Sequence, residues 1–298
     1  MKKFSRYLPS LIASVLLLFS VLGCIGASVS CINISQERLI SQSRSNNITA
    51  TVRKQLEKHF AGRAGSTHVP AEVYMNAVTD EELSRRIEEK IQFGFAVLNG
   101  TEFTESDSEI PQLNSSIEEF YSNYAAENKI TDKEQIAKAA AAAEKSAYDA
   151  ISEQCDVYKF SALKEHGVLN MAAKFYRYRF HLLAVTIAAI AALALILLII
   201  NHKERSAFLY WFGVSTLNAG LLGTIPCVYL LASRYFYAFS IKQQQVFESY
   251  TKAMTSFTEA FMAAAIACSV VGIAMFIIYG VANSKNKSVA PTDVSTSE

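Results

Sequence analysis

Four stretches of the chain consist of apolar and uncharged polar residues, with no Asp, Glu, Lys or Arg. They cover residues 8–29, 180–200, 207–232 and 260–282. Each is at least as long as the ~20 residues that a helix needs to cross the roughly 30 Å of hydrocarbon in a bilayer. The pattern predicts an all-α, multi-pass membrane protein with four transmembrane helices.

The long segment between the first two stretches has the periodicity of helices. Thr79 and Glu82 have the spacing of a capping box, which marks a helix start. Apolar residues then recur every three or four positions, as on one helix face: Leu83, Ile87, Ile91, Phe95 and Leu98. We expect this helix to stop at Gly100, and a second short helix to follow around Ile117 and Tyr121.

A second capping box, at Thr131 and Glu134, precedes an alanine-rich segment of high helix propensity. Its apolar stripe predicts a long helix that runs toward the second span, with a break at Gly167. Residues 31–60 form a comparable stalk after the first span, and loops are expected at 61–70 and 100–116. Two stalks joined by shorter helices predict an elongated antiparallel bundle that folds apart from the membrane.

These elements define four parts of the chain. Residues 1–30 are an anchor or a signal peptide, 31–178 an extracytoplasmic helical domain, 179–283 a three-span membrane domain, and 284–298 a disordered cytoplasmic tail. The N-terminus has two further interpretations. Its basic start and short apolar run also fit a cleaved signal peptide, and the residues ending at Cys24 resemble a bacterial lipobox. All three interpretations place 31–178 outside the cell.

The net charge of +1 hides an uneven distribution. Residues 31–175 contain 22 Asp and Glu against 16 Lys and Arg, which makes nucleic acid an improbable partner because phosphate binding needs a clustered basic surface. Basic residues also flank alternate ends of the spans: Lys2, Lys3, Arg6, Lys203, Arg205, Lys285 and Lys287. The positive-inside rule then predicts a protein of the cell membrane with both termini in the cytoplasm.

Small residues recur at intervals of four in two spans. One face of the third span carries Ser215, Ala219 and Gly223, and one face of the fourth carries Ala260, Ala264, Cys268 and Gly272. Such faces let helices approach closely in lipid. We expect them to pack the spans of one chain, with a protein partner or a second copy as the alternative.

The chain offers little for catalysis. Its five His residues form no close ligand pair, and it has no HExxH, GxSxG, P-loop or CxxC motif. We therefore expect no enzymatic activity, cofactor or metal. The acidic stretch 72–127 does not match an EF-hand loop. Cys31 and Cys155 are the two cysteines of the predicted outer domain, and one disulfide bridge or two free thiols are equally compatible with the sequence.

The layout of one span, a large outer domain and three further spans is similar to that of FtsX- and MacB-type membrane subunits of mechanically acting ABC transporters. This resemblance is one of topology. The outer domain also looks like a chemoreceptor sensor bundle. We expect a non-catalytic envelope protein whose partners are membrane lipid and a protein or cell-wall component that the outer domain binds or senses. The alternative is a membrane subunit of a transport or mechanotransmission complex, because the third span contains Asn218, Thr224 and Pro226.

The predicted topology is tested by cysteine labelling of intact cells from outside. Single cysteines near Ser106 and Gln244 should react with an impermeant reagent, whereas cysteines near Lys203 and Lys287 should not. Labelling at Lys203 would contradict the orientation.

Overall fold

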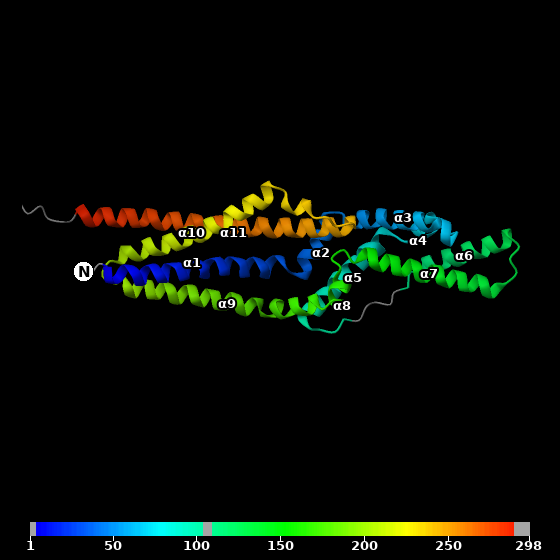
Figure 1. The fold of residues 1–298 in the computed structure, drawn as a ribbon, viewed down its shortest axis with the longest axis horizontal. Coiled ribbons are helices and arrows are strands. Elements are labelled where there is room, and N and C mark those ends of the chain that lie inside the picture. Colours follow the sequence, from blue (N-terminus) through cyan, green and yellow to red (C-terminus); the bar gives the residue numbers. More distant parts are fainter. Residues whose placement is uncertain (1–3, 104–108, 289–298) are drawn as a thin grey trace, which may run out of the picture. The chain divides into compact units, whose positions relative to one another are not determined.

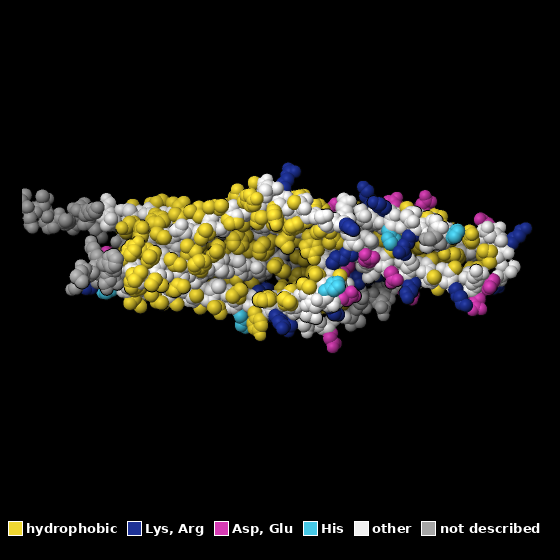
Figure 2. Space-filling model, in the orientation of Figure 1, with side chains coloured by type: hydrophobic (Ala, Val, Ile, Leu, Met, Phe, Trp, Pro, Cys, Tyr) yellow, Lys and Arg dark blue, Asp and Glu magenta, His cyan; other side chains and the backbone are white. Residues whose placement is uncertain are grey.

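The computed structural model describes residues 4–103 and 109–288, and within these ranges it contains helices and turns and no strand. The all-α prediction is therefore confirmed. Four helices are long and apolar enough to cross a membrane, and on the face shown in Figure 2 hydrophobic side chains cover much of them. Their bounds are α1 (Phe4–Asn33), α9 (Val168–Ile200), α10 (Arg205–Ala232) and α11 (Gln244–Ser288).

The predicted cytoplasmic tail begins inside a helix. Helix α11 continues to Ser288, so the expected boundary at residue 284 is too early. The residues that follow the span, 283–290, are mostly polar, so the hydrophobic pattern ends there. They include no Gly or Pro, the residues that most disfavour a helix, and the first Pro is Pro291. The rest of the predicted tail, residues 289–298, lies outside the described residues.

The chain forms two compact units (Figure 1). The first comprises Met1–Asn33, Tyr178–Phe236 and Thr255–Glu298, and we call it the membrane unit. The second, the helical domain, comprises Ile34–Arg177 together with Tyr237–Met254. The sequence predicted a helical domain of residues 31–178 alone. Residues 237–254, which we assigned to the three-span domain, instead contribute Tyr250 and Ala253 to the core of the helical domain.

Over residues 34–103 and 109–177, the helical domain contains seven complete helices, and the adjoining ends of α9 and α11 complete it. The complete helices are α2 (Gln36–Ser45), α3 (Ile48–Thr67), α4 (Ala71–Ala77), α5 (Asp80–Asn99), α6 (Pro111–Glu127), α7 (Lys133–Cys155) and α8 (Phe160–Glu165). A short 3₁₀ helix, η1 (Tyr235–Ala238), precedes α11. In Figure 1, α6 and α7 lie side by side as an antiparallel hairpin.

Helix α5 forms as the sequence predicts and lies at the centre of the domain core. The Thr79 hydroxyl accepts a hydrogen bond from the Glu82 amide at 3.2 Å, and the helix ends at Gly100, whose positive φ of 75° suits glycine. All five predicted apolar residues are buried. At Gly94 the absence of a side chain leaves room for the Phe160 ring, which packs α8 against α5.

The long alanine-rich helix differs from its prediction at both ends. Its N-cap is Asp132 rather than Thr131, because the Asp132 carboxylate accepts hydrogen bonds from the Glu134 and Gln135 amides. It also ends at Cys155 instead of continuing toward the second span. The buried Asp156 carboxylate accepts the amides of Phe160 and Ser161 and so starts the separate helix α8. The predicted break at Gly167, with φ of 72°, separates α8 from α9.

The predicted stalk and loops also need correction. The stalk 31–60 is divided between α1, α2 and α3, because Ser35 caps α2 and Asn47 adopts the left-handed conformation before α3. The predicted loop 61–70 is helical as far as Thr67. Helix α6 begins at Pro111, within the predicted loop 100–116, because Pro is favoured in the first turn of a helix.

In the membrane unit, serine side chains connect α1 and α10. The Ser215 Oγ lies 2.8 Å from both the hydroxyl and the carbonyl oxygen of Ser14, and both serines are buried. Ala219 lies one turn further along α10 and is also fully buried. Hydrogen bonds of this kind contribute only about 0.6 kcal/mol each on average, so close packing of the helices provides the rest of the stability.

Glycines allow α10 and α11 to approach closely. A Cβ atom at Gly220 would lie 2.5 Å from the Ala265 carbonyl oxygen, and one at Gly272 would lie 2.6 Å from the Leu217 amide nitrogen. Gly223 is less restrictive, since its Cβ would meet the Ala265 Cβ at 2.9 Å. The remaining predicted packing residues, Ala260, Ala264 and Cys268, are partly buried against the core of the membrane unit.

A single added methyl group should separate α10 from α11. We expect Gly220→Ala to destabilise the protein by about 1–3 kcal/mol, because the new Cβ meets backbone that has to move. The measurement is thermal unfolding in detergent. Gly280→Ala is the matched control, because nothing lies within 4 Å of its Cβ position. Equal melting temperatures for the two variants would contradict the close packing.

Candidate functional site

The first turns of α11 are bound to the helical domain by aromatic and hydrogen-bond contacts. The Tyr250 hydroxyl donates to the Tyr158 carbonyl oxygen at 2.7 Å, and the two rings pack edge to face with centroids 5.7 Å apart. Thr51 of α3 donates to the Glu248 carboxylate at 2.8 Å. We call residues 243–250 and the side chains that they contact the α11 joint.

Uncharged polar side chains are buried in the α11 joint. Gln245 is fully buried, and its amide nitrogen donates to the side-chain oxygen of Gln154. The other amide atom, Gln245 Oε1, and the buried Ser249 hydroxyl have no hydrogen-bond partner among the described residues. A buried polar atom without a partner costs about 1–3 kcal/mol. Part of the joint is therefore less stable than an apolar contact of the same size.

A polar cleft adjoins the α11 joint. It has a volume of about 330 Å³ and lies between α3 and α7. Its polar lining residues are His59, Arg63, Lys145, Ser146, Asp149 and Glu153. Arg63 donates to the Ser146 hydroxyl at 2.9 Å. Glu153 belongs to both sites, because its carboxylate also accepts a hydrogen bond from Gln243 at 3.1 Å.

The electrostatics of the cleft keep its histidine neutral. Burial lowers the pKa of His59, the charge of Arg63 lowers it further, and the charge of Glu153 acts in the opposite direction. His59 Nε2 is buried without a hydrogen-bond partner within the described chain. The cleft thus offers a neutral imidazole beside cationic and anionic groups, an arrangement suited to binding a polar ligand that carries both charges.

The described residues contain no cluster of three His, Cys, Asp or Glu side chains arranged to hold a metal ion. The two cysteines of the predicted bridge are free thiols in α1 and α7, and the bridge remains a prediction. Burial raises the pKa of the Cys155 thiol to about 12. This thiol is therefore protonated and unreactive at neutral pH.

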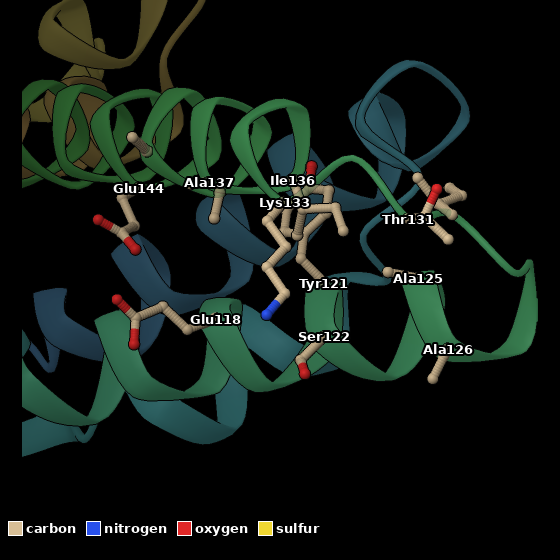
Figure 3. Close-up of a pocket in the computed structure, with 13 residues that line it drawn as sticks. Glu118, Tyr121, Ser122, Ala125, Ala126, Thr131, Lys133, Ile136, Ala137 and Glu144 are labelled. Carbon is tan, nitrogen blue, oxygen red and sulfur yellow. The ribbon is translucent and has the colours of Figure 1, made fainter.

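A larger groove runs between α6 and α7, with a volume of about 780 Å³ (Figure 3). Its walls are mostly small side chains, including Ala125, Ala137 and Ala141. At one end the carboxylates of Glu118 and Glu144 point toward each other across the groove. Burial raises the pKa of Glu144, and the negative charges of Glu118 and Glu109 raise it further.

The four apolar helices make this chain a multi-pass membrane protein, and a folded helical domain accompanies them. Comparison of the chain with protein-family models, curated proteins and solved structures found no match. Its function is therefore argued from its own residues.

Sequence reasoning missed the α11 joint and the cleft. Residues 243–245 are three consecutive glutamines, and in the sequence they resemble a polar loop between two spans. The cleft combines His59 and Arg63 of α3 with residues of α7 that lie more than 80 positions further along the chain. Its one local signal is the i, i+4 spacing of His59 with Arg63 and of Lys145 with Asp149, which is common on any solvated helix face.

The Tyr250 hydroxyl should stabilise the α11 joint. Tyr250→Phe leaves the ring contact with Tyr158 intact and removes the 2.7 Å hydrogen bond. We expect a loss of about 1 kcal/mol and a melting temperature lower by roughly 2–4 °C. Tyr237→Phe is the control, because that residue is exposed in the same unit. An equal melting temperature for both variants would contradict this role.

Proposed function

We propose that the protein is a non-catalytic membrane protein of the cell envelope whose helical domain lies outside the cytoplasm and binds or senses a protein or cell-wall component. In this proposal both termini are cytoplasmic. The predicted positive-inside distribution of Lys and Arg supports this orientation. The polar cleft is the binding site, and the α11 joint responds to its occupancy.

The observation that carries the proposal is the continuity of α11. This single helix supplies Gln244–Met254 to the helical domain and continues through Thr255–Ser288 as part of the membrane unit. Helix α9 is also shared by the two units. Its residues Leu169 and Ala173 lie in the core of the helical domain, and its later residues belong to the membrane unit. Both helices therefore contribute residues to the two units, and in this proposal they connect the cleft with the membrane unit.

The cleft is connected to α11 through Glu153. A ligand that bears a cation competes with Gln243 for the Glu153 carboxylate, and a ligand that bears an anion is attracted by Arg63 and Lys145. Peptides of the cell wall carry both charges on one short chain. The unpartnered atoms of Gln245 and Ser249 make the joint easy to release, because water satisfies them when α11 moves.

The alternative function, a membrane subunit of a transport complex, has less support. Among the polar residues of α10, Ser215 bonds to α1 and Thr216 bonds to backbone oxygens of its own helix. These contacts favour helix packing over a polar path through the membrane.

Co-sedimentation with peptidoglycan sacculi tests the proposed function, using the purified full chain in detergent. We expect binding, and a reduction of at least about fivefold for Arg63→Gln, because a charge-assisted contact to the ligand is lost. Lys138→Gln is the control, since Lys138 lies on α7 outside the cleft and pairs with Glu134.

The same samples are examined by hydrogen exchange. Bound sacculi should increase exchange in residues 244–254, because occupancy of the cleft withdraws Glu153 from Gln243. Absence of binding, or equal binding by the two variants, would contradict binding of a cell-wall component in the cleft. Binding with unchanged exchange in 244–254 would contradict the transmission through α11.

A further inference from the structure

The groove between α6 and α7 exposes apolar surface on one face of two neighbouring helices. On α6 the lining residues fall at helical spacing, from Glu118 through Tyr121 and Ala125. On α7 they run from Lys133 through Ala137 to Glu144. Ala126, Ala137 and Ala141 are exposed, and Ile130 is 38% exposed at the tip of the hairpin. Alanine side chains let another helix approach closely and bury its own apolar face.

The groove carries charges of opposite sign at two positions along its length. Lys133 lies at the first residue of α7, near the tip of the hairpin. Glu144 follows about three helical turns later, and Glu118 faces it from α6 (Figure 3). None of these three side chains forms an ion pair with another described residue. Between Lys133 and Glu144, the residues of α7 that line the groove are apolar: Ile136, Ala137, Ala140 and Ala141.

A partner that complements this groove presents an anion near Lys133, an apolar helix face, and a cation near Glu118 and Glu144. A second copy of the hairpin presents this required pattern when it is turned end for end, because its carboxylates then lie near Lys133 and its Lys133 lies near the carboxylates. An interface with two-fold symmetry requires this property, because one patch has to be complementary to itself.

We propose that this groove is the surface through which two copies of the chain pair, with their α6–α7 hairpins antiparallel. Lys133 of one copy then lies beside Glu118 and Glu144 of the other, and the reverse contact occurs at the opposite end. The alanine faces of both hairpins become buried between them. The inference goes beyond the proposed function and does not depend on it, because the groove and the polar cleft share no lining residue.

Electrostatics support the pairing. The carboxylates of Glu118 and Glu144 repel each other in one chain, which contributes to the raised pKa of Glu144. A cation from a second copy relieves this repulsion. Each exposed charge pair contributes little to the free energy of pairing, but two-fold symmetry makes every pair occur twice.

Charge exchange in the full chain tests the pairing. Oligomeric state is measured by light scattering over a dilution series in detergent, where two copies can pair in either direction relative to a membrane. We expect wild type to dimerise and Lys133→Glu to weaken dimerisation about tenfold, because like charges then meet at both ends. The double variant Glu118→Lys with Glu144→Lys should weaken it similarly. Combining all three substitutions should restore pairing.

The control is Lys138→Glu, which places the same charge change on α7 outside the groove and should leave pairing unchanged. Circular dichroism and thermal unfolding establish that each variant is folded. Higher salt should weaken the wild-type dimer. A wild type that is monomeric throughout, a triple variant that does not recover, or a control that weakens pairing equally would overturn the proposal.

Discussion

The packing of the first turns of α11 against the core of the helical domain is the interaction that makes residues 237–254 part of that domain. Without it, residues 237–254 would be a connection between two spans. The Tyr250 ring packs against Tyr158 and its hydroxyl binds the backbone, so α11 begins against the core of the helical domain. The aromatic contact provides apolar burial, while Gln245 and Ser249 reduce the net gain because their oxygens are buried without partners. We therefore expect the α11 joint to be ordered and the free energy needed to separate it to be small.

The helical domain and the membrane unit are each stabilised by a different force. In the helical domain, burial of Leu83, Ile87 and Ile91 is driven by water, as in any soluble bundle. In lipid that driving force between helices is absent, so association of the spans depends on close backbone approach and a few hydrogen bonds. Gly220 and Gly272 allow the close backbone approach, and the side chains of Ser14 and Ser215 form a hydrogen bond. We therefore expect added methyl groups at these two glycines to destabilise the membrane unit, and a buried charge at Leu83, Ile87 or Ile91 to destabilise the helical domain.

The two surface features of the helical domain have different chemistry. The cleft beside the joint contains both signs of charge and a histidine that stays neutral, and it shares Glu153 with the contacts of α11. The groove of the α6–α7 hairpin is lined by small side chains and by the charged side chains of Lys133, Glu118 and Glu144. The cleft and the groove share no lining residue, so the proposed ligand binding and the proposed pairing of copies use different residues of one domain.

The sequence by itself determined the elements whose signals are local. Charge-free windows identified the four apolar helices, and the capping residue, apolar stripe and terminal glycine of α5 fixed its bounds, because each depends on neighbours within a few turns. Tertiary structure decided the rest. The end of α7 at Cys155 depends on the buried Asp156 carboxylate, and a helical stripe gives no sign of that cap. The assignment of residues 237–254 to the helical domain, and the meeting of His59 with Glu153, depend on contacts between distant segments. Such contacts are selected by the total burial and hydrogen bonding of the folded chain, and no local pattern of residues specifies them.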